Sequence, residues 1–116
     1  YALVDIDRFW QAISNIAFNA IKFTPRDGNV CIKLSKVNNL ARVDIIDNGI
    51  GISPDMIEFV FDKFSKVKRK GTEGEATFGL GLYIVKLLIT KHQGSVSVES
   101  EPDKGSKFSV FIPCAE

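Results

Sequence analysis

The sequence predicts an α+β fold, a two-layer sandwich in which a mixed sheet of about five strands is covered on one face by about three helices. The first observation behind this prediction is an amphipathic helical pattern over residues 8–23. The second is a pair of alternating apolar and polar segments around a tight turn, at 30–45 and again at 96–112. Hairpin strands with helices between them pack as one sheet under one helical layer.

The composition is that of a single globular domain spanning residues 1–116. Hydrophobic residues make up 45% of the chain and charged residues 25%, which is typical of a folded domain with a substantial core. The net charge of +1 creates no field that would favour nucleic acid, so we expect no nucleic-acid partner. The apolar runs are far too short to cross a bilayer, so we expect no direct membrane insertion.

Cys31 and Cys114 lie far apart and have no CxxC or Cys/His spacing. They are typical of free thiols in a reducing compartment, so we expect a cytoplasmic domain, although a pairing between them stays open. Tyr1–Val4 is apolar and reads as a strand already under way. We therefore expect the chain to be part of a longer protein.

The first helix is predicted from Arg8 to Phe23, with Asp5 as its N-cap and Pro25 as its stop. Five apolar residues share one face of this helix and should pack on a sheet. They are Phe9, Ile13, Ile16, Ala17 and Ala20.

Three polar residues, Asn15, Asn19 and Lys22, share what we predict to be the opposite, exposed face of the same helix. An amide oxygen can ligate a hard cation, and a lysine can neutralise a phosphate. An ordinary solvated helix face is the alternative interpretation.

The first hairpin runs from Val30 to Ile45 with a reversal at Asn38-Asn39, and its first strand is predicted to be half buried. Asp47 lies in phase with the buried positions of the second strand, and a buried carboxylate needs a hydrogen-bond donor. It can turn back onto its own backbone, or it can accept from the amino group of a ligand. In the second case Gly49 and Gly51 would let the chain approach a flat ring.

The next segment combines a short helix with a long loop. Pro54 at the first helical position predicts a helix that ends at about Phe59. Residues 65–77 are rich in Lys, Arg and Gly and have no apolar period, which indicates either a solvated loop or a mobile lid for an anionic ligand.

A last helix is predicted to open at 78–82 and to reach about His92. Glycines at a helix start let backbone N–H groups bind phosphate, although close packing would also explain them. We expect a partly positive His92 ring to complement the helix C-terminus, with Gly94 as the C′ residue. A hairpin with its turn at 102–105 closes the chain.

Together these segments resemble the catalytic and ATP-binding (HATPase_c) domain of bacterial two-component sensor histidine kinases. That domain belongs to the GHKL ATPase superfamily and has the Bergerat fold. The resemblance rests on five motifs in order: the N box, the first glycine box, the F box, the second glycine box and a closing G-[ST]-x-F. Here they are residues 15–25, 47–51, 61–64, 79–82 and 105–108.

The resemblance implies ATP and Mg²⁺ as cofactors. Asn19 would ligate Mg²⁺ with support from Asn15, and Lys22 would neutralise phosphate. Asp47 would accept from the adenine amino group, with Ser106 completing that contact through water. The implied nucleotide site as a whole comprises Asn15, Asn19, Lys22, Phe23, Asp47, Gly49, Gly51, Ile52, Phe64, Thr77, Phe78, Gly79, Leu80, Gly81, Leu82 and Ser106.

In this resemblance Phe23 would flank the nucleotide, Gly49 and Gly51 would admit the purine, and the N–H groups around Gly79 and Gly81 would hold phosphates. The cationic loop would be the ATP lid. The chain departs from the family at Thr77-Phe78, where members often have Gly-Thr, and this departure bears on the hinge of the lid.

The resemblance also implies partners, because the phosphoacceptor histidine of the family is absent and His92 stands in the wrong context for it. The phosphoryl group would pass to a histidine on a separate dimerisation and phosphotransfer domain of a homodimeric parent. From there it would pass to the receiver domain of a response regulator. Whether the parent is membrane-anchored stays open.

Two alternatives and one variant of this function stay open. GHKL ATPases of the gyrase, mismatch-repair and chaperone type place a water-activating Glu four residues before the Mg²⁺ ligand, where this chain has Asn15. An amide cannot take a proton from water, which argues against hydrolysis.

A degenerate nucleotide- or partner-binding module without kinase activity is the second alternative. A serine/threonine kinase of the anti-sigma-factor type is a variant of the first function, and Phe61 and Phe64 beside a long lid favour a histidine kinase over it.

Overall fold

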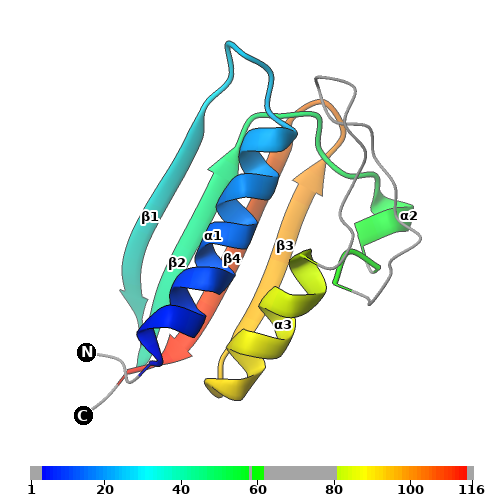
Figure 1. The fold of residues 1–116 in the computed structure, drawn as a ribbon. Coiled ribbons are helices and arrows are strands. Elements are labelled where there is room, and N and C mark those ends of the chain that lie inside the picture. The colour runs from blue at the N-terminus through cyan, green and yellow to red at the C-terminus, as the bar shows by residue number, and fades with distance from the viewer. Residues whose placement is uncertain (1–3, 58, 62–80, 115–116) are drawn as a thin grey trace.

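The computed structural model describes residues 4–57, 59–61 and 81–114. Within these residues, three helices and four strands follow one another in the order shown in Figure 1. They are α1 (Ile6–Lys22), β1 (Val30–Val37), β2 (Leu40–Asp47), α2 (Pro54–Ile57), α3 (Gly81–Lys91), β3 (Ser95–Glu101) and β4 (Gly105–Pro113).

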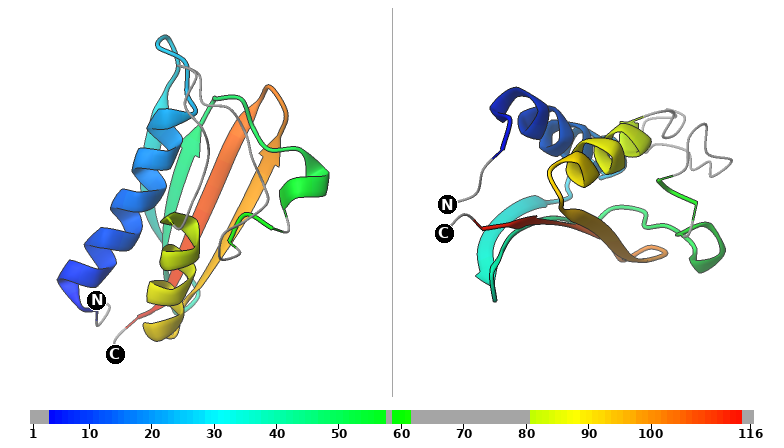
Figure 2. Two further views of the ribbon diagram at one scale, coloured as in Figure 1. Left: turned by 45° about the vertical axis from the view of Figure 1, so that its right-hand side comes forward. Right: turned by 90° about the horizontal axis from the view of Figure 1, so that it is seen from below.

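The four strands form one sheet in the order β1-β2-β4-β3. Helices α1 and α3 lie side by side on one face of this sheet, and the short α2 lies beside β3 (Figure 2). The predicted α+β two-layer sandwich is therefore confirmed. The strands of the described residues pair antiparallel throughout, whereas we expected a mixed sheet of about five strands. Most of the stretch from which the fifth strand was predicted, Tyr1–Leu3, lies outside the described residues, and Val4 is not in a strand.

The hydrophobic core lies between the two helices and the central strands β2 and β4. Branched and aromatic side chains alternate along these strands, so every second one faces the helices. The helices contribute their apolar stripes to the same layer. The fully buried large side chains of this core include Ile16, Phe23, Ile45, Leu82, Val85, Ile89, Phe108 and Val110.

Helix α1 begins where Asp5 caps it, since the Asp5 side chain accepts a hydrogen bond of 3.2 Å from the N–H of Arg8. The predicted N-cap is confirmed, and the helix starts two residues earlier than predicted. Its buried stripe is Ala12, Ile16 and Ala20.

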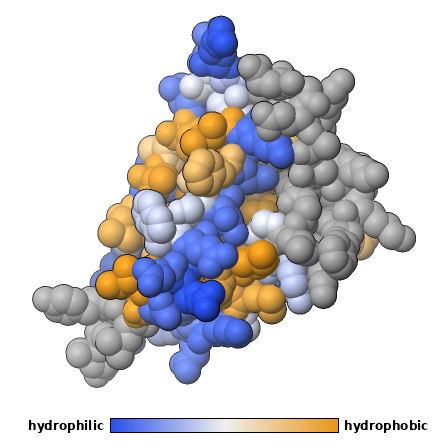
Figure 3. Space-filling model, viewed as in Figure 1, coloured by the Kyte–Doolittle hydropathy of each residue, from blue (hydrophilic) through white to orange (hydrophobic). Residues whose placement is uncertain are grey.

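The polar residues of α1 lie beside its buried stripe and not opposite it. Asn15, Asn19 and Lys22 are half buried on the flank that faces α3, so the prediction of an exposed polar face is wrong. The exposed side instead carries large apolar side chains beside polar ones, and Trp10 and Phe18 are each 70% exposed. Figure 3 shows hydrophobic and hydrophilic areas side by side on this face of the molecule. The reason is that α1 packs on α3 as well as on the sheet, which makes its buried arc wider than one stripe.

The hairpin of β1 and β2 is confirmed, with its reversal at Asn38, whose φ is 55°. The predicted half-burial of β1 is wrong, because Ile32 is 55% and Leu34 76% exposed. Strand β1 is one edge of the sheet, and α1 and α3 lie mainly over the other three strands.

Helix α3 ends at Lys91, and the residue in the left-handed conformation after it is Gln93, with φ 61°. The prediction of Gly94 as the C′ residue is therefore wrong. Glycine is required at position 94 for packing, because a Cβ there would lie 2.1 Å from the carbonyl oxygen of Phe111. The predicted positive ring of His92 is corrected as well, since its Nε2 atom accepts a hydrogen bond and therefore carries no proton.

In the described part of the chain no helix is both long and apolar enough to span a bilayer. The predicted cationic lid, residues 65–77, lies outside the described residues.

Candidate functional site

Asp47 ends β2 with its side chain on the helix-facing side of the sheet, and it is only 4% exposed. Its Oδ1 atom accepts a hydrogen bond of 2.9 Å from the N–H of Gly49. The carboxylate therefore turns back onto its own backbone, which is the first of the two alternatives predicted from the sequence. This contact leaves the second alternative open, because a carboxylate can accept several hydrogen bonds. Ser106 of β4 is paired directly with Asp47 and is equally buried.

The two glycines after Asp47 are explained by backbone packing. A Cβ on Gly49 would lie 2.1 Å from the carbonyl oxygen of Phe23. Gly51 has a φ of 73°, and a Cβ there would lie 2.0 Å from the carbonyl oxygen of Glu101. Other residues would clash at these positions. That the glycines also admit a purine stays a prediction.

Polar side chains of α1 that belong to the first predicted motif lie near the start of α3. The Nδ2 atom of Asn15 donates a long hydrogen bond of 3.4 Å to the carbonyl oxygen of Gly81. The Nδ2 atom of Asn19 is buried and has no hydrogen-bond partner among the residues that the structure describes. The Nζ atom of Lys22 lies 5.9 Å from the ring centroid of Phe23. The fold thus brings the predicted N box next to the start of α3, where the second glycine box ends.

Three residues of the predicted site are core residues. Phe23, Ile52 and Leu82 are 0%, 3% and 1% exposed. Their burial shows that all three pack in the core, and the predicted contact with nucleotide stays a prediction.

Five residues of the predicted site, Phe64 and Thr77–Leu80, lie outside the described residues. Gly81 opens α3, and a Cβ on it would have no described atom within 4 Å. The described part of this helix start is therefore open where we predicted a phosphate contact.

Ser100 is a site residue that the sequence reasoning missed. Its hydroxyl contacts Ser106 at 2.8 Å and accepts a hydrogen bond of 2.8 Å from the N–H of Ile52. The signal was available, since Ser100 continues the alternation of Val96 and Val98 and so faces the same side of the sheet.

The opposite face of the sheet carries a polar cluster around Asp44. Burial would raise the pKa of Asp44, but hydrogen bonds from Ser109 and Arg42 and the charges of Arg42 and Lys107 outweigh it and hold the pKa below its usual range. The Oδ1 atom accepts from the Ser109 hydroxyl at 2.6 Å and from the Arg42 Nε atom at 2.9 Å. The cluster ties β2 to β4 and takes no part in the candidate site.

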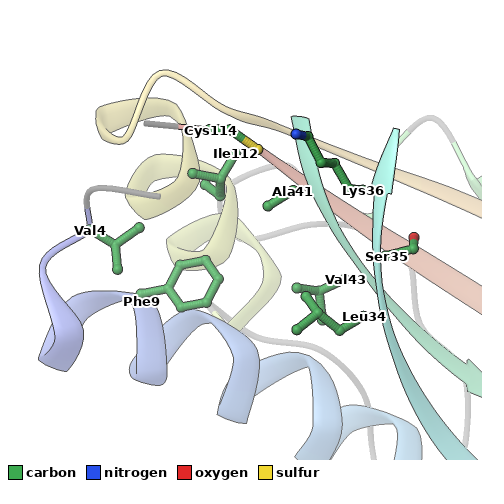
Figure 4. Close-up of a pocket in the computed structure, with 9 residues that line it drawn as sticks. All are labelled: Val4, Phe9, Leu34, Ser35, Lys36, Ala41, Val43, Ile112 and Cys114. Atoms are coloured by element: carbon green, nitrogen blue, oxygen red, sulfur yellow. The ribbon is translucent and has the colours of Figure 1, made fainter. Parts of the chain in front are cut away.

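A hollow of about 410 Å³ lies at the far end of the molecule from Asp47, between the start of α1 and the sheet (Figure 4). It contains none of the predicted site residues. Its lining is largely apolar and consists of Val4, Phe9, Leu34, Ser35, Lys36, Ala41, Val43, Ile112 and Cys114.

Comparison with known proteins gives the same family from sequence and from structure. The family of histidine kinase-, DNA gyrase B- and HSP90-like ATPases (HATPase_c) matches residues 4–116. The sensor histidine kinase RppB of Synechocystis sp. is 37% identical over 113 residues, which cover 97% of this chain and 25% of RppB.

Solved structures show the same likeness. The mycobacterial sensor histidine kinase MprB is similar with a TM-score of 0.82 and 28% identity, over 97% of this chain and 76% of that one. Full-length ShkA, in complex with AMPPNP, is similar with a TM-score of 0.79 and 33% identity, over 99% of this chain and 24% of that one.

The chain therefore belongs to the family of histidine kinase-, DNA gyrase B- and HSP90-like ATPases. Within this family it is the ATP-binding catalytic domain of the sensor histidine kinase type, as the order of its motifs predicted. The chain spans about a quarter of the length of RppB.

Proposed function

We propose that the chain binds magnesium-ATP and positions the terminal phosphoryl group for transfer to a histidine on a separate dimerisation and phosphotransfer domain. The observation that carries this proposal is the buried amide of Asn19, whose Nδ2 atom has no partner in the described part of the chain. An unsatisfied buried amide costs about 1–3 kcal/mol, so such a group calls for a ligand that satisfies it.

The phosphate end of the site would lie between α1 and the start of α3. The amide oxygen of Asn19 suits a hard cation such as Mg²⁺, and its Nδ2 atom can donate to a phosphate oxygen. Lys22 adds a positive charge on the same flank of α1, and the N-terminus of α3 favours negative charge. When bound, the magnesium ion would neutralise phosphate charge.

The base end of the site would lie at Asp47. A buried carboxylate accepts hydrogen bonds, and the amino group of adenine donates them. Ser106 stands directly opposite Asp47 in β4 and adds a second polar group at the same end of the sheet. This pair favours adenine over guanine, which carries a carbonyl oxygen at the corresponding position.

Transfer to a histidine is favoured over hydrolysis by Asn15. The amide of Asn15 contacts the start of α3, but it cannot act as a general base for water. The phosphoryl group would then pass from the histidine to an aspartate in the receiver domain of a response regulator. We expect the parent protein to act as a homodimer, with this domain on the cytoplasmic side.

The first test is a calorimetric titration of the chain with AMPPNP, with and without Mg²⁺, beside the corresponding GTP analogue. We expect Mg²⁺-dependent binding that prefers the adenine compound. Asn19→Ala should abolish the Mg²⁺ dependence, whereas Gln11→Ala, at an exposed position of the same helix, should leave it intact. Absence of binding, or Mg²⁺-independent binding by the unaltered chain, would refute the proposal and favour a degenerate module.

A further inference from the structure

Three polar side chains from three neighbouring strands form one row across the end of the sheet. Asp47 of β2 is paired with Ser106 of β4, and Ser106 is paired with Ser100 of β3. Residues that are directly opposite in a sheet project to the same face. The row lies on the helix-facing side, where the proposed function places the base of the nucleotide.

The hydroxyl of Ser100 has three contacts, each of 2.8 Å. It accepts from the N–H of Ile52, and it lies within hydrogen-bond distance of the carbonyl oxygen of Gly105 and of the hydroxyl oxygen of Ser106. A serine hydroxyl has one proton to donate and two lone pairs to accept with. A carbonyl oxygen can only accept, so the proton of Ser100 goes to Gly105.

This assignment determines the direction of the last contact. One lone pair of Ser100 is used by Ile52, and the other can only accept from Ser106. Ser106 is therefore the donor in the contact between the two hydroxyls. The reverse direction would leave two oxygen atoms, those of Ser100 and Gly105, 2.8 Å apart without a proton between them.

We propose that Ser100 is a positioning residue that makes Ser106 an acceptor toward the nucleotide base and so contributes to the preference for a 6-amino purine. With its only proton directed at Ser100, Ser106 has lone pairs alone to offer. It stands opposite the carboxylate of Asp47, which also only accepts. A base with an amino group matches this row, and a base with a carbonyl oxygen meets only acceptors. This inference rests on the proposed binding of ATP.

The test compares ATP with ITP, which carries a carbonyl oxygen in place of the amino group at position 6. Dissociation constants for both are measured by calorimetry on the unaltered chain, Ser100→Ala and Ser100→Thr. We expect Ser100→Ala to lower the ATP-to-ITP preference about threefold to tenfold, because Ser106 can then rotate and donate. Ser100→Thr keeps a hydroxyl and should restore most of the preference. Ser97→Ala, at an exposed position of the same strand, is the matched control.

The ratio of the ATP and ITP dissociation constants distinguishes a positioning role of Ser100 from a merely structural one. Ser100 also fastens the loop that contains Ile52, so its loss could weaken both nucleotides equally. An unchanged ratio with equally weakened binding would overturn the inference. The double variant Ser100→Ala with Ser106→Ala gives a second criterion. Because Ser100 acts through Ser106, the double variant should have the same ATP-to-ITP preference as Ser106→Ala alone. An additive loss would show that Ser100 acts by another route.

Three remaining outcomes are also decisive. Should Ser100→Ala fail to fold, Ser106→Ala carries the test, because an unchanged ratio in that variant overturns the inference. Should the unaltered chain bind neither nucleotide, the proposed function fails and this inference fails with it. Should it bind ATP and ITP equally, the inference fails together with the proposed base contact of Asp47 and Ser106, whereas the binding of magnesium-ATP stands.

Discussion

The imidazole Nε2 atom of His92 accepts a hydrogen bond of 2.9 Å from the backbone N–H of Asp5, 87 positions away in the sequence. The Nδ1 atom lies 2.8 Å from the carbonyl oxygen of Leu88, so the ring proton resides on Nδ1 and is donated there. The ring also meets Phe9 edge to face, with centroids 6.4 Å apart. His92 therefore connects the end of α3 with the start of α1 and has a structural role.

The first prediction concerns this connection. His92→Ala should lower the free energy of unfolding by about 1–3 kcal/mol, because two hydrogen bonds are lost. Urea denaturation measures the change, and hydrogen exchange of the Asp5 amide should become faster. Thr90→Ala, at an exposed position of α3, is the control. A stability equal to that of the control would mean that the two bonds contribute nothing.

The second prediction concerns the base end of the site. Asp47→Asn can keep the hydrogen bond from Gly49, since an amide oxygen accepts as well, so the fold should survive. The variant loses the charge and gains a donor, and its preference for ATP over GTP should fall about tenfold to a hundredfold. Competition titrations with both nucleotides measure it. Asp27→Asn, in an exposed turn, should keep the original preference, and the idea is wrong if Asp47→Asn does the same.

The third prediction tests where the core lies. Phe108 is fully buried and meets Phe61 edge to face, with ring centroids 6.0 Å apart. Phe108→Ala should cost about 3–5 kcal/mol of stability, a large part of the 5–15 kcal/mol of a typical domain. Phe18→Ala, at a side chain that is 70% exposed, should change stability by less than about 1 kcal/mol. Thermal unfolding of both variants is decisive, and similar losses would contradict the placement of α1.

The fourth prediction is a pH dependence that arises from Asp44. Its folded-state pKa lies below the ordinary value of 3.8, because hydrogen bonds from Ser109 and Arg42 and nearby positive charges outweigh the effect of burial. The unfolded chain therefore takes up a proton first as the pH falls. The stabilisation is complete above the unfolded pKa and is lost as the pH falls through the folded one.

Asp44→Asn measures this contribution. The unaltered chain should be the more stable of the two at pH 6, and the difference should shrink below about pH 4. Urea denaturation at a series of pH values gives both curves. A difference that grows toward acid pH would mean that the sign of the pKa shift is wrong.

Much of the fold could be predicted from local pattern. The N-cap at Asp5, the hairpin reversal at Asn38 and the buried phase of Asp47 all depend on neighbours within a few residues, which a sequence displays directly. The order of motifs likewise identified the family without any structure.

Burial was predicted less well, because it depends on which element covers which. The alternation of Ile32 and Leu34 was a correct signal for a strand, but only the sheet order makes that strand an edge with exposed side chains. The same applies to Trp10 and Phe18 of α1, which are apolar but which no other described element covers.

The sequence by itself determined the elements, the family and the residue types available for nucleotide binding, since these follow from short-range spacing and side-chain chemistry. Only the tertiary structure decided that Asn15 meets the start of α3 and that Asp47, Ser106 and Ser100 form one row. Both depend on strand register and helix packing between segments more than fifty residues apart, and no local pattern contains that information.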